Sequence, residues 1–140
     1  EDAKEEVRKN PDDAKAHYDL GNAYCELDKY REAIKSFKRA IWIEPEYAAA
    51  HNNLGGAHYL MFYKFSWNQS FKQRCTKSAI KSFKHAIRID PDFARAHYGL
   101  GLCYIRNKDK SSALKQHKIL KKLDTKTAKE LLGKIYTELD

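Results

Sequence analysis

Histidine and cysteine are the side chains in this sequence that could ligate a metal ion or act as a nucleophile. Three of the six histidines occupy one position of a repeated sequence block, which favours packing over ligation: His17, His51 and His97. The three cysteines are widely spaced and form no CxxC pair, which favours a reducing compartment: Cys25, Cys75 and Cys103. The sequence has no HExxH motif, no glycine-rich phosphate loop and no GxSxG motif. We therefore expect no catalytic residues, no metal site and no cofactor.

Two sequence blocks, each present three times, define the elements that position these residues. The first block reads AKAHYDLGNAY at 14–24, AAAHNNLGGAH at 48–58 and ARAHYGLGLCY at 94–104. The second reads AIKSFKRAIWIEP at 33–45, AIKSFKHAIRIDP at 79–91 and ALKQHKILKKLDT at 113–125. In both blocks, apolar residues recur at steps of three and four, as in a helix with one buried face. The first two copies of the first block are 34 residues apart, which predicts a stack of helical hairpins.

On these residues the chain resembles the tetratricopeptide repeat (TPR) family. The matching positions carry small or apolar residues, an aromatic residue and a closing proline: Leu20, Gly21, Tyr24, Ala33, Phe37, Ala40 and Pro45 in the first repeat, Leu54, Gly55, Ala79, Phe83, Ala86 and Pro91 in the second, and Leu100, Gly101, Tyr104 and Ala113 in the third. The resemblance implies an all-α fold. We expect a right-handed superhelical solenoid of three helix-turn-helix repeats plus a C-terminal capping helix.

The repeat boundaries divide the chain into five segments. Residues 1–13 are interpreted as the tail of a preceding repeat or an N-terminal cap, because Glu1 is not a natural start. The repeats are assigned to 14–47, 48–93 and 94–127, and the capping helix to 128–140. In the third repeat, His117, Leu120 and Thr125 replace the aromatic residue, the small residue and the proline of the pattern. We therefore expect its second helix to pack less regularly and the capping helix to adjust to Leu120.

Mid-helix glycines predict where the helices approach each other most closely. Gly21, Gly55 and Gly101 each cost about 1 kcal/mol relative to alanine in a helix. A cost that recurs at one position indicates a packing requirement, and we expect Phe37 or Phe83 to fill the adjacent space.

The second repeat is twelve residues longer than the first, and the excess falls at about 62–75. This insertion is rich in aromatic residues and lacks glycine and proline: Phe62, Tyr63, Phe65, Trp67 and Phe71. We predict that both helices of this hairpin are longer by about a turn and a half, with a tight connection near 66–70. The aromatic residues could form an arm that contacts a partner, or they could only pack the longer helices together. Core packing is the favoured interpretation for Phe62 and Tyr63, whereas Cys75, in the same insertion, is a candidate for exposure.

The formal net charge of the chain is +8, and basic residues dominate the second repeat. Between positions 48 and 89 there is no aspartate or glutamate, and there are seven basic residues: Lys64, Lys72, Arg74, Lys77, Lys81, Lys84 and Arg88. Such a one-signed field favours an acidic partner. A solvated outer helix face is the simpler interpretation for Lys77, Lys81, Lys84 and Arg88.

In the TPR family the first helices of the repeats line a concave groove that holds a peptide. The resemblance places these residues on that surface: Lys15, Tyr18, Asn22, Asn52, Asn53, Tyr59, Arg95, Tyr98, Leu102 and Arg106. Asparagine can both donate to and accept from a peptide backbone, and tyrosine offers rigid contact area.

One branch of the family clamps the C-terminal carboxylate of heat-shock chaperones with two lysines, two asparagines and an arginine. Asn22 and Asn53 match that pattern, but Arg95 replaces one lysine, and Tyr18 and Gly99 replace the other two cations. Arginine and lysine are not interchangeable at such sites. We therefore do not expect this chain to bind chaperone tails.

The function that best fits these observations is a non-catalytic scaffold that binds a protein or peptide of acidic character. Nucleic-acid binding is the first alternative, disfavoured because the cations fall mainly on the second helices of the repeats. Self-association through the aromatic insertion is the second. The sequence contains no run of eighteen apolar residues, so no membrane span is predicted. The unpaired cysteines favour a location in the cytoplasm.

Overall fold

The computed structural model describes residues 2–64 and 68–140 of the chain. The described residues form eight α-helices and no strand: α1 (Asp2–Lys9), α2 (Ala14–Glu26), α3 (Tyr30–Ile43), α4 (Ala48–Lys64), α5 (Gln69–Ile89), α6 (Ala94–Arg106), α7 (Lys110–Leu123) and α8 (Thr125–Leu139). The predicted all-α solenoid is therefore confirmed. The pairs α2–α3, α4–α5 and α6–α7 are the three helical hairpins, and α1 and α8 flank them. The capping helix begins at Thr125 rather than at residue 128.

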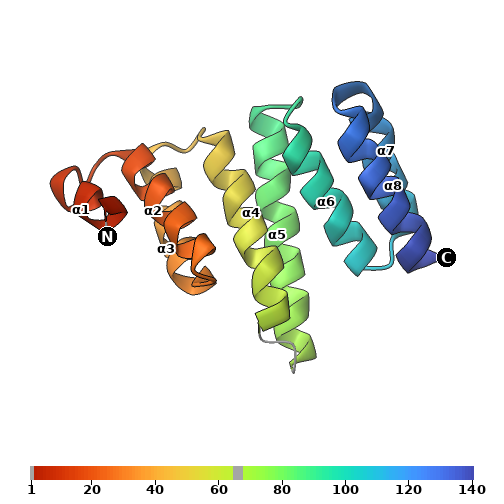
Figure 1. Ribbon diagram of the computed structural model, residues 1–140, viewed down its shortest axis with the longest axis horizontal. Helices are drawn as coiled ribbons and strands as arrows, with labels where there is room; N and C mark the ends of the chain where they lie inside the picture. Colours follow the sequence, from red (N-terminus) through yellow and green to blue (C-terminus); the bar gives the residue numbers. More distant parts are fainter. Residues whose placement is uncertain (1, 65–67) are drawn as a thin grey trace.

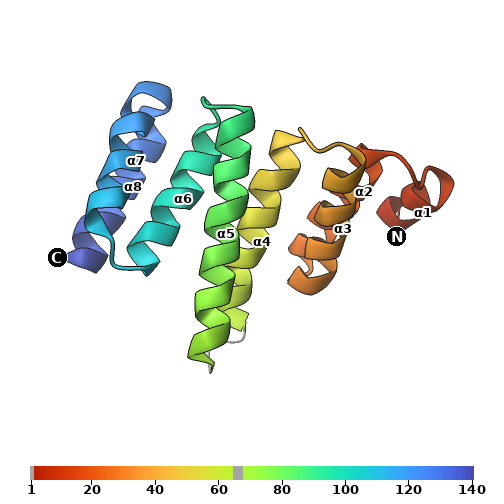
Figure 2. The ribbon, with the colours of Figure 1, turned by 180° about the vertical axis from the view of Figure 1, so that it is seen from behind.

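The helices stand side by side in two layers along the long axis of the molecule (Figure 1). In Figure 1 α4 lies in front of α5, and from behind, in Figure 2, α5 lies in front of α4. The backbones of α2 and α4, of α4 and α6, and of α6 and α8 lie in close contact, whereas the backbones of α3, α5 and α7 lie farther apart in the part of the chain that the structure describes. The layer of α2, α4, α6 and α8 is therefore the inner, concave side of the stack.

Phenylalanine rings wedged against glycines set the spacing of the helices. An added Cβ at Gly21 would lie 2.5 Å from the Phe37 ring, and one at Gly55 would lie 2.9 Å from the Phe83 ring. Both contacts were predicted. Phe83 also meets Gly99 of the next repeat, where an added Cβ would lie 2.4 Å from the ring. The expectation for Gly101 was wrong, because Gly101 packs against Leu131 of the capping helix instead of an aromatic ring.

The repeated histidines tie the first helix of each hairpin to the turn before it. Nε2 of His17, His51 and His97 lies 2.7, 2.9 and 2.7 Å from the carbonyl oxygen of the proline six residues earlier. In each case the imidazole N–H donates to the carbonyl oxygen of a proline in a turn, and this oxygen has no helical N–H to accept from. All three histidines are buried. The packing interpretation of these side chains is therefore confirmed.

The second hairpin is longer than the first at both of its helices, as predicted. Helix α4 has 17 residues against 13 in α2, and α5 has 21 residues against 14 in α3. The Asn68 side chain accepts a hydrogen bond from the Phe71 backbone N–H at 3.0 Å and caps the start of α5. We call the protruding ends of these two helices, residues 60–64 and 68–75, the arm.

Packing inside the arm differs from the expectation at two residues. Phe62 and Phe71 are half-buried and pack against a core that includes Met61 and Cys75. Cys75 is only 3% exposed, although its place in the insertion made it a candidate for exposure. Tyr63 is 61% exposed, so the core position favoured for it was wrong. Phe65 and Trp67 lie outside the described residues.

The irregular third repeat is completed by α8. Leu120 is fully buried together with Leu131 and Ile135 of α8, as its departure from the repeat pattern predicted. Asp124 ends α7 and caps α8, since its side chain accepts from the Thr127 backbone N–H at 3.2 Å. Nδ1 of His117 lies 3.0 Å from the carbonyl oxygen of Ala128. A direct helix-to-helix joint thus replaces the proline turn of the other repeats.

Candidate functional site

The concave face carries the residues that the sequence assigns to the groove, and most of them fall into two clusters. Tyr18, Asn22, Asn52 and Asn53 come together on α2 and α4 and form what we call the amide cluster. Tyr59, Tyr98, Leu102 and Arg106 line a cavity of about 370 Å³ that we call the aromatic cleft. Lys15 and Arg95 belong to neither cluster.

Hydrogen bonds join the two inner helices through the amide cluster. Asn53 donates through Nδ2 to the Asn22 Oδ1 at 2.7 Å and to the Tyr18 hydroxyl at 3.0 Å. Asn52 in turn donates through Nδ2 to the Asn53 Oδ1 at 3.0 Å. The Oδ1 atom of Asn52 is buried and has no hydrogen-bond partner among the described residues. Because Asn52 is only 8% exposed, its Oδ1 is a buried acceptor on the concave face that still lacks a hydrogen-bond donor.

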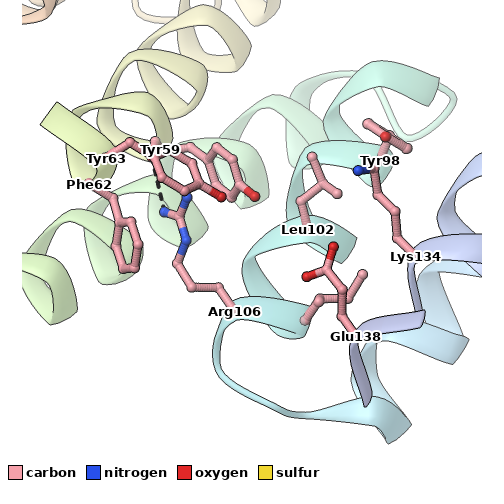
Figure 3. Close-up of a pocket in the computed structure, with 9 residues that line it drawn as sticks. Tyr59, Phe62, Tyr63, Tyr98, Leu102, Arg106, Lys134 and Glu138 are labelled. Atoms are coloured by element: carbon pink, nitrogen blue, oxygen red, sulfur yellow. Dashed lines mark hydrogen bonds between the residues drawn. The ribbon is translucent and has the colours of Figure 1, made fainter. Parts of the chain in front are cut away.

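The aromatic cleft is organised by Arg106, which reaches from the end of α6 toward the arm (Figure 3). Its guanidinium carbon lies 3.5 Å from the ring centre of Tyr59 and 3.7 Å from that of Phe62. The Nη1 atom donates to the Tyr59 carbonyl oxygen at 3.0 Å. A planar cation stacked between rings keeps a fixed orientation, which a lysine could not reproduce. The Nη2 atom is buried and forms no well-aligned hydrogen bond with a described residue, although a looser contact of the Arg106 side chain lowers the pKa of the neighbouring Tyr63 hydroxyl.

Helices α6 and α8 form the opposite wall of the aromatic cleft. Tyr98 and Leu102 come from α6, and Lys134 and Glu138 come from α8, as Figure 3 shows. Burial raises the pKa of the Tyr59 and Tyr98 hydroxyls, so both side chains are neutral at physiological pH. The cleft therefore combines apolar ring surface with the stacked Arg106 cation, one exposed lysine and one carboxylate. The sequence analysis missed Lys134 and Glu138, although their spacing of four residues places them on one face of the last helix.

Lys15 and Arg95 occupy the ends of the inner helices, outside both clusters. The Lys15 Nζ lies 2.8 Å from the Asp19 carboxylate, and this hydrogen bond raises the pKa of Lys15. The Arg95 guanidinium carbon lies 5.7 Å from the ring centre of Phe93. Both side chains are exposed, so neither interaction fixes them as firmly as stacking fixes Arg106.

The cysteines show no activated environment. Burial raises the pKa of Cys103 to about 12 and that of Cys25 to about 11, so both thiols are protonated at neutral pH. Over residues 2–64 and 68–140, no three His, Cys, Asp or Glu side chains are placed to hold a metal ion. Within the same residues, no helix combines the length and the apolar character needed to cross a lipid bilayer.

The chain belongs to the tetratricopeptide repeat family. A TPR repeat family model matches residues 21–61 and 76–108, more than half of the chain, and a second tetratricopeptide repeat model matches residues 3–35. The search of curated proteins found no match.

Solved structures share the solenoid fold. TTC0263, a thermophilic TPR protein of Thermus thermophilus, superimposes with a TM-score of 0.83 at 21% identity, over 94% of this chain and 68% of that one. MamA superimposes with a TM-score of 0.74 at 29% identity, over 91% of this chain and 67% of that one. The chain thus spans about two thirds of the length of these two. The first TPR of Spaghetti (RPAP3), bound to an HSP90 peptide, gives a TM-score of 0.74 at 19% identity, over 90% and 92% of the two chains. These likenesses support the fold assignment.

Proposed function

We propose that this protein is a non-catalytic scaffold whose concave face binds an extended segment of a partner protein across the amide cluster and the aromatic cleft. TPR proteins generally mediate protein–protein interactions, and the RPAP3 domain is a neighbour solved with a bound peptide. The residues assigned to the groove are inferred from the structure of this chain and are not transferred from the RPAP3 domain.

The observation that carries the proposal is a pair of unsatisfied buried atoms. Among the described residues, the buried side-chain polar atoms without a hydrogen-bond partner are the Asn52 Oδ1 and the Arg106 Nη2. One is an acceptor and the other a donor, and both belong to the inner helix layer. An unsatisfied buried polar group costs about 1–3 kcal/mol. The N–H and C=O groups of a peptide backbone would complement these two atoms once binding shifts the side chains that cover them.

The ligand also needs an apolar residue and a negative group. The rings of Tyr59, Phe62 and Tyr98 offer the aromatic cleft an apolar wall. The Arg106 Nη2 suits a carboxylate at least as well as a carbonyl oxygen, because a charged acceptor strengthens the bond. We therefore favour a partner segment with an acidic residue next to an apolar one. Tyr18 and Gly99 replace two cations of the chaperone clamp. We therefore do not propose that this chain binds the HSP90 peptide found on the RPAP3 domain.

The cations predicted to favour an acidic partner lie mostly away from the groove. Six of the seven basic residues between 48 and 89 are on α5, in the outer layer: Lys72, Arg74, Lys77, Lys81, Lys84 and Arg88. This placement speaks against a nucleic-acid strand along the concave face, where phosphate contacts would be needed. The three free thiols favour a reducing compartment, and we place the protein in the cytoplasm on that basis.

A peptide selection tests the proposal. Peptides selected from a random display library on the immobilised protein would be measured by fluorescence anisotropy against the wild type, Asn52→Ala and the matched control Asn107→Ala. Asn107 is exposed and its side chain makes no hydrogen bond to a described residue. We expect Asn52→Ala to weaken binding by about tenfold, the loss of one buried hydrogen bond, and the control to bind like the wild type. Equal affinity of all three proteins for every selected peptide would contradict the proposal.

The same binding measurement, repeated at two salt concentrations, distinguishes peptide binding from nucleic-acid binding. A single-stranded oligonucleotide that binds through phosphates loses affinity steeply as salt rises, whereas a peptide held by buried hydrogen bonds and ring contacts loses little. Binding only to the oligonucleotide, with a steep salt dependence, would favour that alternative.

A further inference from the structure

A second cleft lies away from the concave face, between α3, α4 and α5. Its volume is about 270 Å³, and the side chains of Ile41 and Leu54 contribute its apolar part. Helix geometry explains the convergence, since residues three, four and seven apart share one helix face. Ser78, Lys81 and His85 follow this spacing on α5 and meet Lys38 of α3 across the cleft.

The polar lining of this cleft is rich in hydrogen-bond donors and contains no carboxylate. Two ammonium groups, Lys38 and Lys81, two serine hydroxyls and three imidazoles line it. None of Lys38, His58, Lys81 and His85 makes a side-chain hydrogen bond or ion pair to another residue that the structure describes. Glu46 lies near the edge but is paired with Arg88 at 3.0 Å. These four side chains are therefore available to a ligand, whereas the His51 N–H is already used by the Pro45 carbonyl oxygen, and no carboxylate in the lining competes for them.

We propose that this outer cleft binds a phosphate group carried by a larger ligand. A phosphate oxyanion presents several acceptor oxygens and a double negative charge, which matches two ammonium groups flanked by hydroxyl and imidazole donors. A carboxylate offers only two oxygens and would leave donors unused. Ile41 and Leu54 provide apolar surface for the carbon portion of the phosphorylated ligand. This site is separate from the peptide groove, so a result that contradicts peptide binding would not contradict phosphate binding here.

Two histidines make the binding depend on pH. Burial, with a smaller contribution from Lys38, lowers the pKa of His58 to about 4. Burial also lowers the pKa of His85, helped by His51, Arg88 and Lys81 and opposed by Glu46. Both imidazoles are therefore neutral at pH 7 when the cleft holds no anion. A bound anion favours their protonated forms, so binding takes up protons, and an anion whose own charge stays constant binds more tightly as the pH falls.

The test is an NMR titration of the whole chain with sodium phosphate, against sodium chloride at equal ionic strength, following the imidazole signals of His58 and His85. We expect saturable shifts in the wild type. Lys38→Ala/Lys81→Ala should weaken phosphate binding by about tenfold or more, as expected for two charge-assisted hydrogen bonds. The matched control is Lys35→Ala/Lys84→Ala, which removes the same charge from the same two helices outside the cleft. Shifts that never saturate, or equal weakening in both double variants, would overturn the site.

Two further probes sharpen the assignment. Sulfate keeps its charge between about pH 7 and pH 5.5, so tighter sulfate binding at the lower pH reports histidine protonation alone; unchanged affinity would overturn the proton coupling. Phenyl phosphate should bind more tightly than inorganic phosphate because its ring contacts Ile41 and Leu54. Weaker binding of phenyl phosphate would overturn the assignment to a larger ligand.

Discussion

Replacing Gly99 by alanine should destabilise the solenoid, whereas the same replacement at Gly133 should stabilise it. The new Cβ at position 99 would lie 2.4 Å from the Cζ atom of Phe83, where an ordinary carbon–carbon contact is about 3.5–4.0 Å. The Phe83 ring is only 4% exposed, and it cannot retreat toward α4 because Gly55 already lies against it there. At Gly133, in the middle of α8, an added Cβ has no neighbour within 4 Å.

The two substitutions share one energy term and differ in the other. Glycine to alanine in a helix gains about 1 kcal/mol, and this gain applies at both positions. Overpacking a close crossing costs about 1–3 kcal/mol, and this cost applies at Gly99 only. The Gly99→Ala protein should therefore be between equal to the wild type and about 2 kcal/mol less stable, and Gly133→Ala should be more stable by up to about 1 kcal/mol.

Urea unfolding followed by circular dichroism measures both free energies under the same conditions. The informative quantity is the difference between the two variants, for which we expect about 1–3 kcal/mol. A Gly99→Ala protein as stable as Gly133→Ala would refute the reasoning that Phe83 is trapped between two glycines. A Gly56→Ala variant, also with no neighbour within 4 Å, provides a second control from helix α4.

Three further predictions follow from single side chains. His58 has a pKa of about 4 in the folded chain and about 6.5 when unfolded, so the unfolded state binds more protons between these values. Stability should fall by about 1–3 kcal/mol as the pH drops from 7 to 4, and His58→Gln should flatten this slope in urea titrations. Asp124→Ala removes the cap of α8 and should lower the thermal unfolding temperature at pH 7, with a smaller effect below the lowered pKa of the Asp124 carboxyl. Arg106→Lys keeps the charge but loses the stacking against Tyr59 and Phe62, so hydrogen exchange should accelerate at residues 60–64, and unchanged exchange would contradict the assigned role.

Local patterns predicted the helices and their pairing because each hairpin buries its faces mostly against itself. The periodic apolar residues, the mid-helix glycines and the phenylalanine after them are close in sequence, so Phe37 could be placed against Gly21 without coordinates. The Gly99–Phe83 contact could not, since it joins two repeats and depends on their relative rotation. The burial of Cys75 was missed for a related reason: it follows from how the two long helices of the arm pack together.

The candidate sites, more than the helices, are built from contacts between residues that lie far apart in the sequence. The groove positions were assigned from the family pattern, but the stacking of Arg106 depends on the extra length of α4, which carries Phe62 to the end of α6. No signal in the sequence marked the outer cleft, because its residues come from three helices and each lysine alone resembles a solvated surface residue. His58 and His85, which lie outside the repeated histidine position, likewise give no indication in the sequence that they share one cleft.

The most direct measurement of the central claim is which face of the stack a selected peptide occupies. A peptide carrying a nitroxide label broadens amide signals near its binding site. Binding in the concave groove predicts strong broadening for Gly56 of α4 and Leu102 of α6, with Lys35 of α3 and Lys84 of α5 spared. Broadening of the outer-layer lysines with the inner helices unaffected would contradict the account.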